Sequence, residues 1–594
     1  LAVERAQWTY QELHDLQAEV EALGRSDFHQ PSQRDEFEKK KVQLREKELV
    51  KAQGAALRAR QRWNEDGERS TKYFLGLERA RKPPPGELSV RAPDGEVITG
   101  RAKVARAVRH TWSTIFAEPT APDPTQPVAL DQSPPAKAAA SKFRGGWLKT
   151  LTKKAAAHAQ RAIGMDETWP VIKRLREGAS PGPDGLSAVI YKIHWHLLGP
   201  MWIDMVQDAE ARGALHVDVS GGLLILLPKS EDSVRRPEDN RPITLLNVDY
   251  KILTAVLTAR LNPCMPRLIH NHQTGFIAGR FIGDNVVFTR DFLEWKRHHK
   301  EQAHIVFCDF QKAYDRVRWS WLWSVLEHVG LGDRFLRLVQ ACYANPIVTV
   351  ILEGVSLGEI APTRGVRQGC PLSPLLFALC TEPLHEALRT RPSILGVELP
   401  RRADNRWVAA IKAMLFADDI TLFPRDEHDL RRMLGLIREF GHASGALLNA
   451  SKTLVLQARP SSATTFGGLT ILKGEKEVKS LGILYGAEVP PAHQWVRFMV
   501  KMQERVRRWR GRGSLTVVGR VAVANALVTS VACYMAAFTT PTAAQLKQMD
   551  DMICHWCGTN TSTRGLRGEE GGCRWRTRNY QRRREGWDCY CRQH

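Results

Sequence analysis

The sequence predicts a mixed α/β (α+β) chain of several domains, and three observations lead to this prediction. The chain has 594 residues, of which 43% are hydrophobic and 25% charged, a composition typical of a globular protein with a large core. Short apolar runs, such as residues 223–227 and 304–310, indicate buried strands, and residues 346–354, where apolar and polar residues alternate, indicate another strand. Longer stretches with few helix breakers lie around these runs and indicate helices.

The charge balance favours a polyanionic partner. Lysine and arginine total 86 against 64 acidic residues, which gives a net charge of +22 and a pI near 9.7. Nucleic acid is the first expectation and an acidic membrane surface the second. The densest apolar run, residues 223–227, is far shorter than the roughly 20 residues of a membrane span, so no membrane is expected. Eleven scattered cysteines fit a reducing, intracellular compartment.

The first part of the chain differs in composition from the rest. Residues 1–117 are predicted as a helical, charged extension, in which residues 34–62 form a long helix rich in Glu, Lys and Arg. This helix could be a nucleic-acid arm or simply a solvated surface helix. Residues 118–160 begin with a Pro- and Ala-rich stretch and are predicted as a linker.

Two adjacent acids, Asp418 and Asp419, join two short apolar runs and are expected at the tip of a hairpin. Such a pair is costly unless a cation lies between the carboxylates, although Asp is also a common turn residue. Asp309 ends the buried strand over residues 304–308, and one sheet could bring all three acids together. Three carboxylates suit two hard divalent cations such as Mg²⁺, which could activate a 3′-hydroxyl and stabilise leaving pyrophosphate.

Two basic side chains and a glycine-rich segment are further candidates. Lys229 and Arg241 flank a predicted hairpin that could clamp a triphosphate, or could belong to a solvated loop. Gln368 lies beside glycines that would allow the backbone to approach a ligand closely. Ser373 is predicted to cap a helix that has Pro374 in its first turn and runs to about residue 388.

The order of these motifs resembles a reverse transcriptase, and more narrowly the polymerase of non-LTR (LINE-type) retrotransposons. The resemblance extends over about 300 residues and rests on several short strings in family order. They are Ser180-Pro181-Gly182-Pro183-Asp184-Gly185, Lys229 with Arg241-Pro242-Ile243, Asp309-Phe310 with Tyr314-Asp315, Arg367-Gln368-Gly369-Cys370-Pro371-Leu372-Ser373-Pro374, and Phe416-Ala417-Asp418-Asp419.

The resemblance implies a right-hand polymerase with palm, fingers and a helical thumb, preceded by the N-terminal extension. The implied divisions are fingers and entry to the palm over 161–300, palm over 301–490, thumb over 491–560 and a basic tail over 561–594. The reverse transcriptase domain itself would cover about 221–486. The tail could bind nucleic acid non-specifically or could be decayed sequence.

The resemblance also implies roles for individual residues. Asp309, Asp418 and Asp419 would bind two Mg²⁺ ions, with Mn²⁺ as a possible substitute, and Lys452 would give a proton to pyrophosphate unless it is a plain surface lysine. The implied nucleotide-binding residues are Lys229, Arg241, Phe310, Gln368 and Tyr314, which matches the gate against a ribose 2′-hydroxyl. The implied primer and template contacts are Gly482, Arg508 and Arg520. Asp315 is expected to be structural.

The cysteines near the C-terminus leave two interpretations open. Cys554-His555-Trp556-Cys557 invites a zinc site, with further Cys and His residues downstream. In the family pattern the segment around Trp556 is an apolar helix, which would make these cysteines core residues.

Together these features predict an RNA-directed DNA polymerase that extends a DNA 3′-hydroxyl on an RNA template with deoxynucleoside triphosphates. The expected setting is the nucleus or a nucleoprotein particle, with the endonuclease on another part of a longer chain or on another protein. Two alternatives are a decayed or domesticated copy that binds RNA, and a group II intron-type enzyme, whose usual Tyr-Ala-Asp-Asp turn is absent.

Overall fold

The computed structural model describes residues 88–118, 136–147, 149–229, 232, 234–399, 410–473, 477–486, 493–510 and 517–557, with four isolated positions nearer the N-terminus. The predicted helix over 34–62 and the tail over 561–594 therefore lie almost wholly outside the described residues. The chain divides into two compact units. One holds Arg81–Gln494 with Ala537–Thr540, and the other holds the remaining residues, chiefly a set of C-terminal helices.

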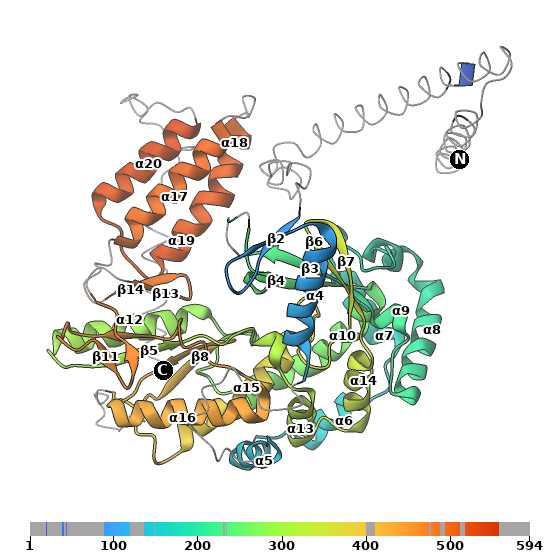
Figure 1. Ribbon diagram of the computed structural model, residues 1–594, viewed down its shortest axis with the longest axis horizontal. Coiled ribbons are helices and arrows are strands. Elements are labelled where there is room, and N and C mark those ends of the chain that lie inside the picture. Colours follow the sequence, from blue (N-terminus) through green and yellow to red (C-terminus); the bar gives the residue numbers. More distant parts are fainter. Residues whose placement is uncertain are drawn as a thin grey trace, which may run out of the picture. The chain divides into compact units, whose positions relative to one another are not determined.

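The first sheet of the larger unit is antiparallel and has the strand order β10-β5-β9-β8. Its strands are β5 (His304–Cys308), β8 (Ala413–Phe416), β9 (Asp419–Leu422) and β10 (Leu454–Gln457). Its short apolar strands give it a buried interior, as predicted for residues 304–308. Helices α15 (Ser373–Thr390) and α16 (Glu427–Ser444) lie alongside this sheet (Figure 1) and share its hydrophobic core.

The second sheet has the order β4-β3-β6-β7. Its strands are β3 (Gly222–Pro228), β4 (Asn240–Leu246), β6 (Val348–Leu352) and β7 (Val355–Ile360), so the strands predicted around 223–227 and 346–354 are confirmed. Strand β3 pairs with β4 antiparallel and with β6 in parallel. Helix α4 (Arg101–Phe116) covers this sheet (Figure 1), burying Val104, Val108 and Trp112 against its apolar side chains.

Further helices complete the larger unit. They are α5 (Ala136–Gly146), α6 (Lys153–Ala159), α7 (Met165–Arg174), α8 (Ala188–Arg212), α9 (Val217–Ser220), α10 (Val248–Leu261), α11 (Met265–Leu268), α12 (Ile282–His298), α13 (Trp319–Val329) and α14 (Asp333–Tyr343). Short 3₁₀ turns cover Pro237–Asp239, Asn262–Cys264 and Tyr314–Arg316. Three two-stranded pairs add β1 (Ser89–Arg91) with β2 (Val97–Thr99), β11 (Thr465–Phe466) with β12 (Leu469–Thr470), and β13 (Glu477–Ser480) with β14 (Ile483–Gly486).

The second unit is helical in its described part. It contains most of α17 (His493–Arg510), then α18 (Val517–Val523), a π-helical segment Ala524–Thr529, α19 (Ser530–Ala536) and α20 (Ala543–Cys557). Their shared core includes Trp495, Trp509 and Trp556.

One stretch of this unit differs from the sequence expectation about membranes. Residues Gly519–Ala536 have a mean hydropathy of 1.3 and are long and apolar enough to cross a membrane by length and composition. The earlier prediction weighed uninterrupted apolar runs and so passed over a stretch broken by Arg520 and Asn525. Within it Val523 and Ala532 belong to the core shared with α17 and α20. A single helix of this kind is weak evidence for a membrane, because core helices have the same composition.

Three sequence predictions are wrong in part. Residues 89–99 of the predicted helical extension form the β1–β2 hairpin. The predicted linker over 118–160 contains α5 and α6, because Phe143 and Trp147 bury completely in the main core. Ser373 is the first residue of α15 rather than its cap, and the helix continues to Thr390.

Candidate active site

The predicted acidic hairpin exists, and its turn is strained. Phe416 pairs with Asp419, so Ala417 and Asp418 form the turn between β8 and β9. Ala417 has a φ of 56°, a backbone conformation that residues other than Gly, Asn and Asp seldom adopt. Backbone strain of this kind costs about 1–3 kcal/mol and persists where neighbouring groups hold it in place.

The side chain that holds the turn is Gln273, which the sequence analysis missed. Its buried Oε1 accepts hydrogen bonds from the backbone N–H of Ala417 (3.0 Å) and of Gly275 (2.9 Å), and its Nε2 donates to the Ala417 carbonyl (3.4 Å). A Cβ on Gly275 would lie 2.4 Å from the Ala417 nitrogen, so glycine is required there. The segment also pairs with β8, since Leu415 N–H donates to the His272 carbonyl (2.9 Å). No local pattern reveals this contact, because it joins residues far apart in the sequence.

Asp309 lies beside the hairpin, as predicted. Cys308 pairs with Ile420 in the β5–β9 ladder, so the next residue along β5 comes opposite Asp419. The Asp309 Oδ2 accepts a hydrogen bond from Asn449 Nδ2 (3.2 Å) and lies 3.5 Å from Lys452 Nζ. The predicted Lys452 is thus brought to Asp309, and Asn449 is an additional partner of the same carboxylate.

The electrostatics of the three acids are those of charges crowded together. The pKa of Asp419 is raised to about 7, first by protein atoms that displace water around the turn and then by the charges of Asp418 and Asp309. The pKa of Asp418 is also raised, mainly by burial and further by Asp309. The Asp419 side chain is nevertheless exposed, so a cation could reach it from solvent.

The two predicted cationic residues lie at the loop end of the β3–β4 hairpin. Leu227 pairs with Arg241, and Lys229 follows directly after β3. Both basic side chains are exposed. Their positive charges lower the pKa of Asp418, against the larger effect of burial, so they face the same site as the acids.

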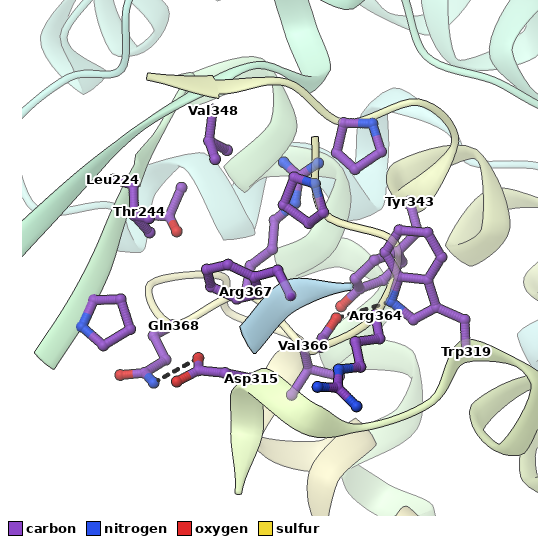
Figure 2. Close-up of a pocket in the computed structure, with 15 residues that line it drawn as sticks. Leu224, Thr244, Asp315, Trp319, Tyr343, Val348, Arg364, Val366, Arg367 and Gln368 are labelled. Atoms are coloured by element: carbon purple, nitrogen blue, oxygen red, sulfur yellow. Dashed lines mark hydrogen bonds between the residues drawn. The ribbon is translucent and has the colours of Figure 1, made fainter. Parts of the chain in front are cut away.

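Gln368 connects this hairpin to Asp315. Gln368 Nε2 donates to Asp315 Oδ1 (2.9 Å), and the Gln368 carbonyl accepts from Thr244 N–H (2.7 Å) on β4. Figure 2 shows the two side chains together at the edge of a pocket lined by the second sheet and residues 362–368. Asp315 is fully buried, which supports its predicted structural role, and burial raises its pKa to about 6.

The two predicted aromatic site residues differ in position. Tyr314 is half-buried and stacks on Phe377 at a ring distance of 4.5 Å. Its pKa is raised by burial and by the nearby Asp418 charge, which places it at the site. Phe310 is 5% exposed and its side chain packs in the main core, and its nucleotide-binding role stays a prediction.

The predicted primer and template residues lie on the β13–β14 hairpin and on the C-terminal helices. Gly482 (φ 85°) and Leu481 (φ 50°) form the exposed turn of the β13–β14 hairpin, where glycine suits the left-handed conformation. Arg508 lies on α17 and Arg520 on α18, both in the helical unit. Trp556 is buried on α20 and donates to the Arg520 carbonyl (3.0 Å), which favours the apolar-helix interpretation of residues 554–557. The cysteines further downstream lie outside the described residues.

Comparison with known proteins identifies the region that contains these residues. Residues 227–485 match the family model described as reverse transcriptase (RNA-dependent DNA polymerase). A domain of this family implies a polymerase palm fold, in agreement with the observed mixture of helices and sheets.

Three relatives illustrate the similarity. The transposon TX1 uncharacterized 149 kDa protein of Xenopus laevis is 29% identical over 558 residues, which cover 90% of this chain and 40% of that protein. The retrovirus-related Pol polyprotein from type-2 retrotransposable element R2DM of Drosophila melanogaster is 28% identical over 53% of this chain and 29% of its own length. The probable RNA-directed DNA polymerase from transposon BS, also of Drosophila melanogaster, is 27% identical over 44% of this chain and 28% of its own length.

The chain thus spans 40% or less of the length of each of these relatives. The family match, the retrotransposon names of the relatives and the motif order agree with one another. The predicted resemblance is confirmed, because residues 227–485 match the reverse transcriptase family and the relatives are named as proteins of transposable elements.

Proposed function

We propose that this chain is an RNA-directed DNA polymerase of a non-LTR retrotransposon, which extends a DNA 3′-hydroxyl on an RNA template. The observation that carries the proposal is the convergence of Asp309, Asp418 and Asp419 at a braced hairpin that faces two exposed cationic side chains. An acidic centre beside a cationic edge is the arrangement that nucleotidyl transfer from a triphosphate requires.

The donor set of the acidic centre fits divalent metal binding. Carboxylate oxygens are the ligands that Mg²⁺ prefers, and the raised pKa of Asp419 reflects burial first and then repulsion by Asp418 and Asp309, which a bound cation would relieve. We propose that Asp309, Asp418 and Asp419 would hold two Mg²⁺ ions, or Mn²⁺ in their place. When bound, such ions supply Lewis-acid stabilisation of the attacking and leaving oxygens.

Side chains of the protein would bind the triphosphate, donate a proton and select the sugar. Lys229 and Arg241 would bind the triphosphate, since their side chains are exposed and close enough to influence Asp418. Lys452, within 3.5 Å of Asp309, would donate the proton that pyrophosphate takes up. Tyr314, stacked on Phe377, would form the wall beside the sugar that excludes a 2′-hydroxyl. Gln368 would lie between nucleotide and template.

We further propose the layout of a right hand for the two units. Residues 301–490 would be the palm, 161–300 the fingers and palm entry, and 491–560 the thumb. Exposed arginines on α17 would contact the template–primer backbone, as would the turn at Gly482. The apolar stretch Gly519–Ala536 would belong to the thumb core rather than to a membrane.

The remaining partners are proposals of the same kind. The primer would be nicked chromosomal DNA, cut by an endonuclease that lies on another part of a longer chain or on another protein. The place of action would be the nucleus or a nucleoprotein particle. The net charge of +22 supports the DNA primer and the nuclear or nucleoprotein location, because a strongly basic protein binds nucleic acid.

The test is deoxynucleotide incorporation on a primed RNA template with Mg²⁺. The parent chain should extend the primer and the double variant Asp418→Asn plus Asp419→Asn should not, because neutral amides hold Mg²⁺ poorly. Extension by both proteins would contradict the metal-site assignment. No extension by either, with RNA still bound in a salt-dependent manner, would identify a decayed copy that acts as an RNA-binding protein.

A further inference from the structure

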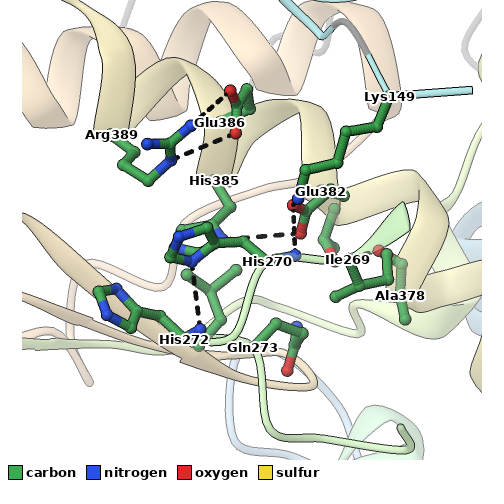
Figure 3. A network of polar contacts seen from close by, with 12 residues as sticks. Lys149, Ile269, His270, His272, Gln273, Ala378, Glu382, His385, Glu386 and Arg389 are labelled. Carbon is green, nitrogen blue, oxygen red and sulfur yellow. Dashed lines mark hydrogen bonds and ion pairs between the residues drawn. The ribbon is translucent and has the colours of Figure 1, made fainter. Parts of the chain in front are cut away.

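A cluster of three histidines lies outside the acidic centre and has no part in the proposed reaction. His270 and His272 belong to the segment before Gly275, and His385 projects from α15. One potential ligand atom from each side chain lies within 4.8 Å of the others. Figure 3 shows the three imidazole rings gathered beside Glu382.

Several polar atoms of this cluster are buried without a hydrogen-bond partner among the described residues. His385 is 1% exposed, and neither of its ring nitrogens forms a hydrogen bond with any residue that the structure describes. The buried Glu382 Oε2 also has no hydrogen-bond partner among the described residues and lies 3.6 Å from His385 Nδ1. Buried polar atoms left unsatisfied cost about 1–3 kcal/mol each, so such a group calls for an explanation.

The bonds that the cluster does make would orient metal ligands. His270 Nδ1 accepts from the His272 backbone N–H (3.2 Å), which fixes the orientation of the His270 ring. The His272 ring is hydrogen-bonded to the backbone of Ala413, the first residue of β8. Glu382 Oε1 accepts from the His270 backbone N–H (2.7 Å), which places the carboxylate beside His385. A metal-binding histidine characteristically donates its second ring N–H to a carbonyl or carboxylate, as the His272 ring does to the backbone of Ala413.

The nearby charges also matter. Lys149 Nζ lies 3.9 Å from Glu382 Oε1, and Arg389 is paired with Glu386 on the same helix. Burial and then the neighbouring histidines lower the pKa of His270 to about 3, and burial and then His385 lower the pKa of His272 to about 4.

We propose that His270, His272 and His385 form a zinc site that ties the segment before Gly275 to α15, with Glu382 orienting His385. Three neutral imidazoles suit Zn²⁺ and not Mg²⁺ or Ca²⁺, which take oxygen ligands. Because the His272 carbonyl pairs with Leu415 of β8, the bound ion would also steady the strand that leads into the acidic turn. The proposal does not depend on polymerase activity.

Metal content of the purified full chain tests the site. The chain is stripped with a chelator, equilibrated with zinc sulfate and desalted, and zinc is then measured by mass spectrometry. The parent and the control His196→Ala, an exposed histidine on α8, should each retain one more zinc per chain than His385→Asn. Equal zinc in all three would overturn the proposal.

A spectroscopic measurement separates this site from any site made by the C-terminal cysteines. Co²⁺ bound by three imidazoles gives visible bands without thiolate charge-transfer absorption. These bands should be present in the parent and absent from His385→Asn. Cobalt bands with thiolate character alone would place the metal on cysteines and reject the histidine site.

Thermal unfolding guards against a variant that misfolds. Zinc should raise the melting temperature of the parent and of His196→Ala, with no comparable shift in His385→Asn, and Mg²⁺ should give no shift through this site. If His385→Asn does not unfold cooperatively, His270→Gln replaces it in all three measurements. Equal zinc-induced shifts in parent and variant would overturn the proposal.

Discussion

The β8–β9 turn and the loop end of the β3–β4 hairpin supply the opposite charges of the candidate site, and the fold holds them differently. The acids are short side chains on paired strands, and Gln273 braces the turn that bears them. Lys229 and Arg241 are long, exposed side chains at the end of a hairpin. A metal needs ligands at fixed positions, whereas a phosphate-binding cation can follow its ligand.

Because the two regions differ in this way, substitutions in them should affect different steps of the reaction. Loss of an acid should abolish the chemical step, loss of the brace should weaken it, and loss of a cation should mainly weaken nucleotide binding. A buried acid between the two regions, Asp315, should affect stability more than chemistry.

The largest effect is expected for Asp309→Asn. The amide would bind metal poorly, and because metal stabilisation of a transition state is worth several kcal/mol, incorporation should fall on the order of 10³-fold. Single-turnover extension on primed RNA measures it. Asp333→Asn, an exposed acid in the first turn of α14, is the control and should retain the parental rate. A loss below about tenfold in Asp309→Asn would mean that Asp309 is not a metal ligand.

The brace should give an intermediate effect. Gln273→Ala leaves the buried N–H groups of Ala417 and Gly275 without their acceptor, at a cost of about 1–3 kcal/mol each. We expect a lower melting temperature and a rate about 10–100-fold below the parent, because the acids lose their fixed geometry.

Gln302 offers a matched control for this variant. It also accepts from two backbone N–H groups, those of Ala303 and Arg459, but it is exposed. Gln302→Ala should therefore keep nearly parental stability and activity. If Gln273→Ala loses stability but keeps the parental rate, the acids do not depend on the brace.

The cationic edge should show its effect in nucleotide affinity. Lys229→Ala or Arg241→Ala removes a charge-assisted contact worth about 1.5–3 kcal/mol, so KM for the deoxynucleotide should rise about 10–100-fold with a smaller change in kcat. Steady-state kinetics at several salt concentrations measures this effect. Lys103→Ala on α4 is the control, and its exposed side chain should leave KM unchanged. A fall in kcat with constant KM would instead place these cations in the chemical step.

The two regions also differ in how much of them the sequence could reveal. Asp418 and Asp419 were predictable because a hairpin is local, and the apolar strands on either side mark it. The β3 and β6 strands were predictable for the same reason. These features need only neighbouring residues to be recognised.

The features that were missed all depend on contacts between distant segments. Gln273 braces Ala417 across 144 residues, and His385 joins His270 through the packing of α15. The linker prediction failed because Phe143 and Trp147 pack into the main core, and composition alone does not indicate this packing. The burial of the Phe310 ring in the main core likewise could not be seen from its place next to Asp309 in the sequence.

The smallest effect is expected at Asp315, in the pH dependence of stability. Burial raises its pKa from 3.8 to about 6, so the folded chain holds a proton that the unfolded chain releases. The stability that proton binding at Asp315 gives the folded chain is therefore fully present below pH 4, and it is lost as the pH rises through 6. Asp315→Asn keeps an oxygen that can accept from Gln368 and removes the buried charge. The free energy of unfolding of this variant should exceed that of the parent by about 1–3 kcal/mol at pH 8 and by less at pH 5. Urea titrations at both pH values measure the difference, and an equal difference at the two pH values would show that Asp315 does not titrate between them.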